Sequence, residues 1–283
     1  MLVTTKEMLL DAQKNHYAVG AFNVENLEFV MAVLAAAEET KSPVIMQTTP
    51  GTIKTAGLDY FYGMVAAAAA RTDVPVALHL DHGDGYDRCM QAFRTGYTSV
   101  MIDGSHESFE DNIALTASVA RAGAAMGVPV EAELGKVGGK EDDGPAVEGE
   151  NPYTDPEEAR EFVERTGCTS LAIGVGTAHG VYTETPHIEQ EVVKAIRAAV
   201  DVPLVLHGTS GVPDEQVAEA VKNGICKVNY ATDLRIAFSK GLKEYLAGDP
   251  EAFDPKKYSA VGREQVKEYV MSKILVCGSN GKA

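Results

Sequence analysis

Three histidines combine a residue type and a setting that favour metal-ion chemistry. His82, His179 and His207 each follow a short apolar run of the sequence. If these runs are strands that end at one edge, the three side chains converge, and three imidazoles with an open fourth position are typical of a catalytic zinc site. Each histidine could instead cap a helix or hydrogen-bond to a neighbour, and the sequence leaves that alternative open.

Several carboxylates stand where they could move protons near such a metal. Asp81 lies directly beside His82, which suits a general acid–base group, although it could also only orient an imidazole. Glu141 belongs to a Gly-rich, acidic insertion, residues 135–152, that could close over a substrate; the alternative is a solvated acid in an acidic run. Glu133 and Asp103 are interpreted as extra metal ligands or as groups that orient the ligands.

Two loops have the composition of phosphate-binding turns. They read Gly208-Thr209-Ser210-Gly211 and Asn229-Tyr230-Ala231-Thr232, and each precedes a helical pattern. Small residues let backbone N–H groups approach an anion at a helix N-terminus, which is a common phosphate site of barrel enzymes. The same turns could serve only as tight connections and helix caps.

The elements that would position these groups follow a repeated β-then-α pattern. Expected strands cover residues 18–24, 44–47, 76–80, 99–103, 129–133, 170–174, 204–206 and 225–229, and expected helices cover 25–40, 60–71, 86–95, 109–126, 155–165, 188–200, 214–223 and 232–245. Eight βα units at a spacing of about 30 residues predict an α/β fold, the (β/α)8 TIM barrel. A helix over residues 264–274 is expected as a C-terminal addition. An open doubly wound sheet would share the alternation.

Composition narrows the class of protein further. The chain has 283 residues and a formal net charge of −16, so nucleic acid and anionic membranes are disfavoured as partners. We expect one domain spanning residues 1–283. The start lacks the layout of a signal peptide and no window resembles a membrane helix, which favours the cytoplasm. The 4 cysteines are widely spaced and are interpreted as buried thiols.

Four segments together carry a family resemblance. They are Leu78-His79-Leu80-Asp81-His82-Gly83, Ser99-Val100-Met101-Ile102-Asp103-Gly104-Ser105-His106, Val130-Glu131-Ala132-Glu133-Leu134-Gly135 and Leu204-Val205-Leu206-His207-Gly208. They resemble the class II, zinc-dependent fructose/tagatose-bisphosphate aldolases, and the similarity extends over nearly the whole chain.

The resemblance implies a TIM barrel that reversibly cleaves a ketose 1,6-bisphosphate into dihydroxyacetone phosphate and glyceraldehyde 3-phosphate through a zinc-stabilised enediolate. It makes His82, His179 and His207 the zinc ligands, with Glu133 joining when the site rearranges. It makes Asp81 the acid–base group at the C4 hydroxyl and Glu141 the group at C3. The dihydroxyacetone-phosphate pocket, often with Na⁺ or K⁺, would comprise Gly180, Gly208, Thr209, Ser210, Asn229, Thr232 and Asp233.

The sugar is less well determined. The loop over residues 47–54 is more similar to the tagatose branch than to the fructose branch, whereas Thr209 and Tyr230 stand where smaller residues are usual. The family also implies a homo-oligomer, a dimer or tetramer, and some tagatose-type members need a supporting protein. A barrel hydrolase or a non-catalytic sugar-phosphate binder is the competing interpretation. Lys227, the nearest candidate for Schiff-base chemistry, is interpreted as structural or surface-exposed.

Overall fold

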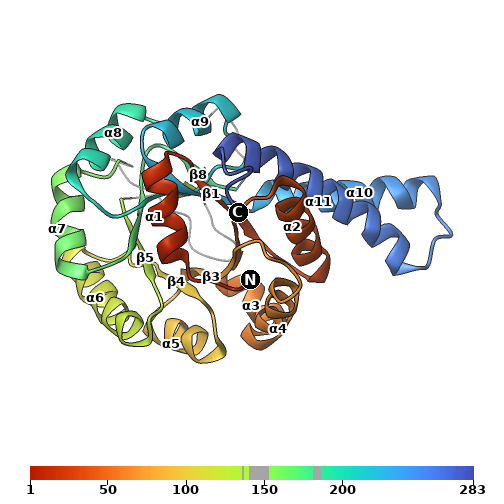
Figure 1. Cartoon of the computed structure of the whole chain (residues 1–283), viewed down its shortest axis with the longest axis horizontal. Coiled ribbons are helices and arrows are strands. Elements are labelled where there is room, and N and C mark those ends of the chain that lie inside the picture. The colour runs from red at the N-terminus through yellow and green to blue at the C-terminus, as the bar shows by residue number, and fades with distance from the viewer. Residues whose placement is uncertain (136, 140–152, 181–185) are drawn as a thin grey trace.

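The computed structural model describes residues 1–135, 137–139, 153–180 and 186–283. Eight parallel strands close into a barrel in the order β1-β10-β9-β7-β5-β4-β3-β2 (Figure 1). The strands are β1 (Val19–Asn23), β2 (Val44–Thr48), β3 (Val76–Gly83), β4 (Ser99–Ile102), β5 (Val130–Leu134), β7 (Ser170–Ile173), β9 (Leu204–Leu206) and β10 (Ile225–Tyr230). The predicted (β/α)8 barrel is therefore confirmed, and all eight predicted strands are present.

Helices form the outer ring of the barrel, and most of them pack an apolar face on the strands. The ring contains α2 (Leu27–Thr40), α3 (Pro50–Ala56), α4 (Leu58–Ala69), α5 (Tyr86–Thr95), α6 (Phe109–Met126), α7 (Pro156–Thr166), α8 (Gln190–Ala199), α9 (Asp214–Lys222) and α10 (Thr232–Gly248). Side chains cap several of these helices; Asn26, Thr49, Ser108 and Asp155 accept hydrogen bonds from backbone N–H groups in the first turn. Within the described part of the chain, no helix is long and apolar enough to cross a membrane.

One helix that the sequence pattern did not predict closes the N-terminal end of the barrel. Helix α1 (Thr5–Asn15) crosses that end (Figure 1). Its Met8, Leu9 and Ala12 pack on inward-facing residues of β1 and β2 such as Ala21 and Ile45. The larger apolar cluster lies between the strands and the outer helices. Helix α1 thus covers the N-terminal ends of the strands, and the functional side chains lie at their C-terminal ends.

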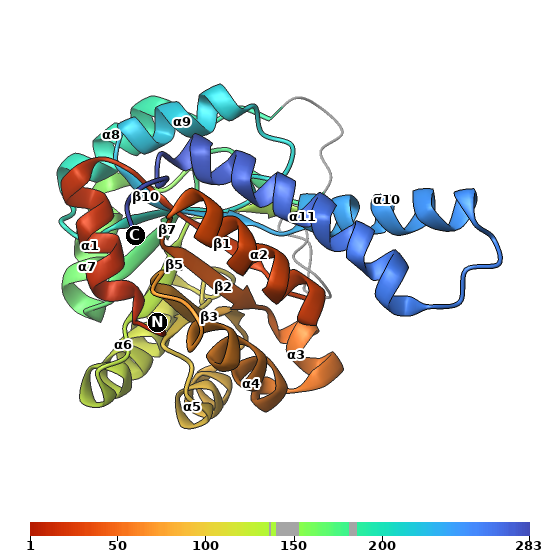
Figure 2. The same cartoon turned by 45° about the vertical axis from the view of Figure 1, so that its right-hand side comes forward.

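Helix α11 (Pro255–Cys277) is the predicted C-terminal addition, but it is much longer than residues 264–274. It packs along α2 and α10, and the ends of α10 and α11 project together from the barrel (Figure 2). The two helices approach closely where Gly241 faces Gly262, since a Cβ on Gly241 would lie 3.0 Å from the Gly262 Cα.

A further pair of short strands lies outside the barrel sheet. β6 (Gly138–Gly139) pairs in parallel with β8 (Ala178–His179), and the pair lies after the ends of β5 and β7. The sequence pattern did not predict it. Its effect is to fix the backbone that carries His179, which would otherwise stand in a loop.

Candidate active site

The end of β3 carries two adjacent functional side chains that point to the same place. Consecutive residues of a regular strand face opposite sides, but the pairing of β3 with β4 shifts between Leu80 and Gly83, and His82 adopts a left-handed backbone with φ of 48°. A left-handed conformation is uncommon for a non-glycine residue and is found mainly where a site requires it. The irregularity turns both Asp81 and His82 into the mouth of the barrel.

The three predicted histidine ligands meet at this mouth. The ring centroid of His82 lies 4.9 Å from that of His179 and 4.8 Å from that of His207, and the centroids of His179 and His207 are 6.0 Å apart. One nitrogen of each ring lies within 4.8 Å of the others. His82 comes from β3, His179 from β8 and His207 from the residue after β9, so three separate elements build the cluster.

Gly208 allows the approach of two of these elements. Its φ is +65°, and a Cβ at this position would lie 2.7 Å from backbone atoms of Ala178. Any other residue would push the chain after β9 away from β8, which would separate His207 from His179.

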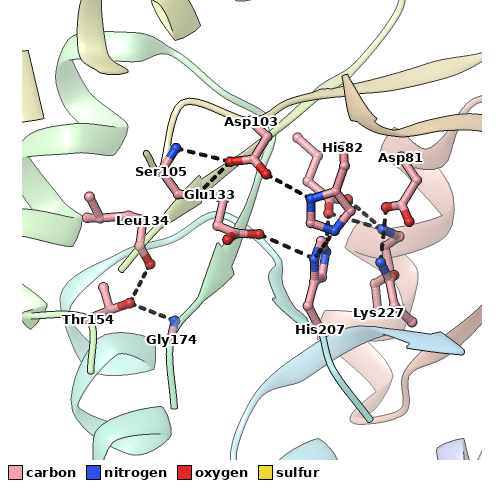
Figure 3. A network of polar contacts seen from close by, with 12 residues as sticks. Asp81, His82, Asp103, Ser105, Glu133, Leu134, Thr154, Gly174, His207 and Lys227 are labelled. Atoms are coloured by element: carbon pink, nitrogen blue, oxygen red, sulfur yellow. Dashed lines mark hydrogen bonds and ion pairs between the residues drawn. The ribbon is translucent and has the colours of Figure 1, made fainter. Parts of the chain in front are cut away.

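Carboxylates hold two of the rings from behind. His82 Nδ1 donates to Asp103 Oδ2 at 2.8 Å, and His207 Nε2 donates to Glu131 Oε1 at 3.0 Å (Figure 3). The other nitrogens, His82 Nε2 and His207 Nδ1, then face each other at 3.1 Å. Two lone pairs at that distance would repel each other, so a positive charge must lie between the two nitrogens, either a proton on His207 or a metal ion, and the donor set fits a metal ion in this place.

The electrostatics of the cluster agree with a cation-binding centre. Burial lowers the pKa of His179, and the neighbouring rings of His82 and His207 lower it further. Burial also opposes charge on His207, but its contacts with Glu131 and Glu133 outweigh that effect and raise its pKa to about 9. Burial would raise the pKa of Asp103, yet the hydrogen bond from His82 holds it well below the usual range.

Glu133 lies next to His207 in the histidine cluster. Its Oε2 is 3.3 Å from His207 Nδ1, and the same atom has no hydrogen-bond partner among the described residues. His82, Asp103 and Glu133 also form a second group whose ligand atoms lie within 4.8 Å of one another. The position of Glu133 is therefore compatible with the predicted role of an additional ligand, which stays a prediction.

Asp81 is fixed by amide donors and not by the histidines. It is 1% exposed, and its two oxygens accept hydrogen bonds from Gln47 Nε2 at 2.9 Å and Asn229 Nδ2 at 3.0 Å. Gln47 Nε2 also donates to Asn23 Oδ1 at 2.8 Å. In the described part of the chain, Asn23 Nδ2, Gln47 Oε1 and Asn229 Oδ1 are buried without a partner, so polar atoms around Asp81 remain available to a ligand.

The predicted phosphate pocket opens beside these groups. The cavity is lined by Asn23, Asp81, His82, His179, Gly180, Gly208, Thr209, Ser210, Asn229, Ala231 and Thr232. Helix α10 begins at Thr232; its N-cap residue, Ala231, has no side chain that could cap it, and the Asp233 N–H donates to Ser210 Oγ at 3.4 Å. A helix N-terminus beside loops of small residues has the geometry that suits an anion, so the predicted phosphate site is compatible with the structure and stays a prediction.

Two predicted residues of this region lie elsewhere than the cavity wall. Asp233 accepts hydrogen bonds from the Gly211 N–H at 3.1 Å and from the Tyr269 hydroxyl at 2.7 Å, so it braces the loop. Tyr230 is buried against Phe22, with ring centroids 5.6 Å apart, and does not crowd the pocket. Thr209 does line the cavity. Glu141 lies outside the described residues, and its predicted role stays a prediction.

Sequence reasoning missed several contributors. Gln47 donates to Asp81 and also to Asn23, and Glu131 accepts from His207. The available signal was their position at strand ends or on inward faces, where polar residues are unusual. Lys227 is fully buried in the barrel, so of the two interpretations given above the surface position is excluded.

A family model of class-II fructose-bisphosphate aldolases matches residues 3–282. The chain belongs to the class-II fructose-bisphosphate aldolase family. Among solved structures, the YdjI aldolase from Escherichia coli K12 is similar to this chain. The two superpose with a TM-score of 0.89 and are 41% identical, and the match covers 100% of both chains.

Two further crystal structures are similar. A putative fructose-1,6-bisphosphate aldolase from Coccidioides immitis has a TM-score of 0.88 and 30% identity over 98% of this chain and 96% of its own. The fructose-bisphosphate aldolase Fba from Campylobacter jejuni has a TM-score of 0.82 and 25% identity over 100% and 97%. The aldolase therefore shares both fold and length with these proteins.

Proposed function

We propose that this aldolase reversibly cleaves a ketose 1,6-bisphosphate into dihydroxyacetone phosphate and glyceraldehyde 3-phosphate, with Zn²⁺ as cofactor. The observation that carries the proposal is the convergence of three imidazoles beside a buried carboxylate, Asp81, at the mouth of a cavity that ends on a helix N-terminus. Family membership gives the reaction class, and these groups are the ones that such a reaction needs.

Asp81 is proposed to take the proton of the C4 hydroxyl during cleavage. The C3–C4 bond then breaks, C4 becomes the aldehyde carbon and the electron pair remains on C3 of the three-carbon fragment. The two amide donors, Gln47 and Asn229, hold the carboxylate in one orientation, which keeps it within reach of one hydroxyl. Glu141 is proposed to return a proton to C3, which completes dihydroxyacetone phosphate.

The C1 phosphate is proposed to bind where α10 begins. Gly208, Thr209, Ser210 and Thr232 line that end of the cavity, and the backbone N–H groups there can donate to phosphate oxygens. Because the phosphate is then anchored on one side of the cavity, the reacting carbons reach the histidines on the other side.

His82, His179 and His207 are proposed to hold Zn²⁺, and Glu133 is proposed as a ligand after rearrangement. The facing ring nitrogens of His82 and His207 support this assignment, as does the Glu133 oxygen, which makes no hydrogen bond to any described residue. When bound, the ion would act as a Lewis acid for the negative charge that develops on the substrate oxygens. Asp103 and Glu131 would keep two of the rings oriented.

Tagatose 1,6-bisphosphate is proposed as the preferred sugar, supported by the sequence of the loop over residues 47–54. The two candidate sugars differ in configuration at C4, so the side chains around Asp81, namely Asn23, Gln47 and Asn229, are the ones that would distinguish them. A homo-oligomer and a cytoplasmic setting complete the proposal; the 4 free, buried cysteines are compatible with a reducing compartment.

A coupled assay tests the proposal directly. Cleavage of fructose and tagatose 1,6-bisphosphates is followed through reduction of the triose products, before and after treatment with a chelator, and after Zn²⁺ is restored. We expect cleavage that is lost with chelator and recovered with Zn²⁺, with higher kcat/KM for the tagatose compound. Full activity in excess chelator would contradict the zinc assignment, and equal kcat/KM would contradict the sugar preference.

A further inference from the structure

A buried ion pair lies inside the barrel beneath the histidine cluster. Lys227 on β10 has no exposed surface, and its Nζ lies 3.0 Å from Glu131 Oε1 and 2.9 Å from Glu131 Oε2 on β5. Figure 3 shows Lys227 beside His207. Glu131 is 2% exposed. In the function proposed above, Glu131 only keeps the His207 ring oriented, and Lys227 has no role.

Stability alone does not explain this pair. Removing two charges from water costs several kcal/mol for each ion, and apolar residues of similar volume often replace a buried pair with no loss of stability. A barrel interior filled with apolar side chains would therefore be an equally stable solution. A role in the neighbouring site gives a reason for the pair.

Glu131 is also the partner of a predicted metal ligand. Its Oε1 accepts a hydrogen bond from His207 Nε2 at 3.0 Å, while the carboxylate of Glu133 lies 3.3 Å from His207 Nδ1. Glu131 and Glu133 are two residues apart on β5, so both point to the same face of the strand. One strand thus places a carboxylate at each nitrogen of a single imidazole.

The two carboxylates differ in what surrounds them. Lys227 contacts both oxygens of Glu131, whereas Glu133 Oε2 has no hydrogen-bond partner in the described part of the chain. His79 also lies close to Glu131: His79 Nε2 is 3.7 Å from Glu131 Oε2, and His79 Nδ1 is 2.8 Å from Ser99 Oγ. Glu131 is therefore a fixed, charged acceptor, and its contact with His207 is favourable only when His207 Nε2 carries a proton.

We propose that Glu131, oriented by Lys227, is a positioning residue that keeps the proton of His207 on Nε2 and turns Nδ1 toward the other two histidines. The inference rests on the proposed metal-binding function. An imidazole whose distal N–H is held by a carboxylate has one available lone pair in one direction, so the ligand set does not have to be ordered when the ion arrives. Lys227 acts through Glu131 and does not contact the reaction.

Two double variants of nearly equal volume test the proposal. Glu131→Gln/Lys227→Met removes both charges but keeps an amide oxygen that can accept from His207 Nε2. Glu131→Leu/Lys227→Met removes both charges and the acceptor. Because neither variant leaves an unpaired buried charge, both are expected to fold, which circular dichroism and urea denaturation check. Lys267→Met, which removes a lysine paired with Glu39 on the outer surface, is the matched control.

Two readouts are measured on each protein. Nitrogen-15 NMR of the histidine rings in the metal-free protein, recorded at about pH 10 so that the His207 ring is neutral, reports its tautomer, and competition with a chromophoric chelator reports Zn²⁺ affinity. We expect the Nε2–H tautomer and affinity within about threefold of wild type for the Gln double variant. We expect a mixture of tautomers and a loss of about 10–100-fold in affinity for the Leu double variant.

The outcomes separate this inference from the proposed function. Equal tautomer populations and equal affinities in the two double variants would overturn the positioning role, whether the affinities are high or low. If wild type does not bind Zn²⁺, the proposed function fails, while the tautomer measurement still shows whether Glu131 controls His207. Lys267→Met is expected to match wild type in both readouts.

Discussion

Replacement of Asp81 by Asn gives the sharpest test of the acid–base assignment. The substitution keeps the shape of the side chain and removes its charge and its ability to take a proton. In wild type both carboxylate oxygens accept hydrogen bonds, from Gln47 at 2.9 Å and from Asn229 at 3.0 Å. The variant has one oxygen and one NH₂ group, so one of the two amide donors must face another donor.

The structure sets the size of two separate effects. One buried donor without an acceptor costs about 1–3 kcal/mol of unfolding free energy, which for a chain of this size lowers Tm by roughly 2–10 °C. Loss of a general acid–base group lowers kcat by about 10²–10⁴-fold. The Zn²⁺ content is expected to stay the same, because Asp81 makes its contacts with amides and not with the histidines.

The assay is the coupled cleavage of both candidate bisphosphates, with metal content measured on the same samples. Asp84→Asn is the matched control, since Asp84 is a 55% exposed carboxylate three positions further along the same segment, paired with Arg88. The control is expected to keep the kcat of wild type. If Zn²⁺ content falls together with kcat, Asp81 mainly supports the metal site. If kcat falls by less than tenfold, Asp81 is not the base.

Three further predictions address other groups. His179→Ala should abolish Zn²⁺ binding and cleavage while leaving the circular dichroism spectrum unchanged; a His179→Ala protein that still cleaves substrate without bound Zn²⁺ would refute this prediction. Glu141→Ala should strongly suppress solvent exchange of the C3 hydrogen of dihydroxyacetone phosphate, whereas Asp81→Asn should spare much of it; exchange at the wild-type rate in the Glu141 variant would place the C3 base elsewhere. Burial lowers the pKa of His79 to about 3, so between pH 6.5 and about 3 the unfolded chain binds a proton that the folded chain does not, and stability falls with acid. His79→Asn should reduce the pH dependence of the urea-unfolding free energy there by up to about 1.4 kcal/mol per pH unit, and an unchanged slope would contradict this.

Local signals were sufficient for the barrel. Each strand is a short apolar run followed by a break and an amphipathic helix, and such signals act within about ten residues of chain. The predicted strand over residues 204–206 and the helices over 86–95 and 109–126 agree with β9, α5 and α6 residue for residue. Short or atypical elements were missed: α3, which begins with Pro50, and α1, which packs on the end of the barrel and belongs to no βα unit.

The histidines and Asp81 could be predicted because polar residues at strand ends have few structural reasons to be there. Parallel strands bring their carboxyl ends to one face, so the position in the chain already implies convergence. The irregular backbone at His82 could not be predicted in this way. It depends on the shifted pairing of β3 with β4, which is a contact between segments about twenty residues apart.

Only the tertiary structure decided the partners of these groups. In sequence, Lys227 is an ordinary lysine and Glu131 is one acid of several; the closure of the barrel brings β10, β5 and the end of β9 together so that Lys227, Glu131 and His207 are in contact. Likewise Gln47 and Asn229 reach Asp81 only across neighbouring walls of the barrel. Residue types and periodicity are properties of short segments, whereas the proton position on an imidazole or the orientation of a carboxylate depends on atoms that only the closed barrel brings within 3 Å.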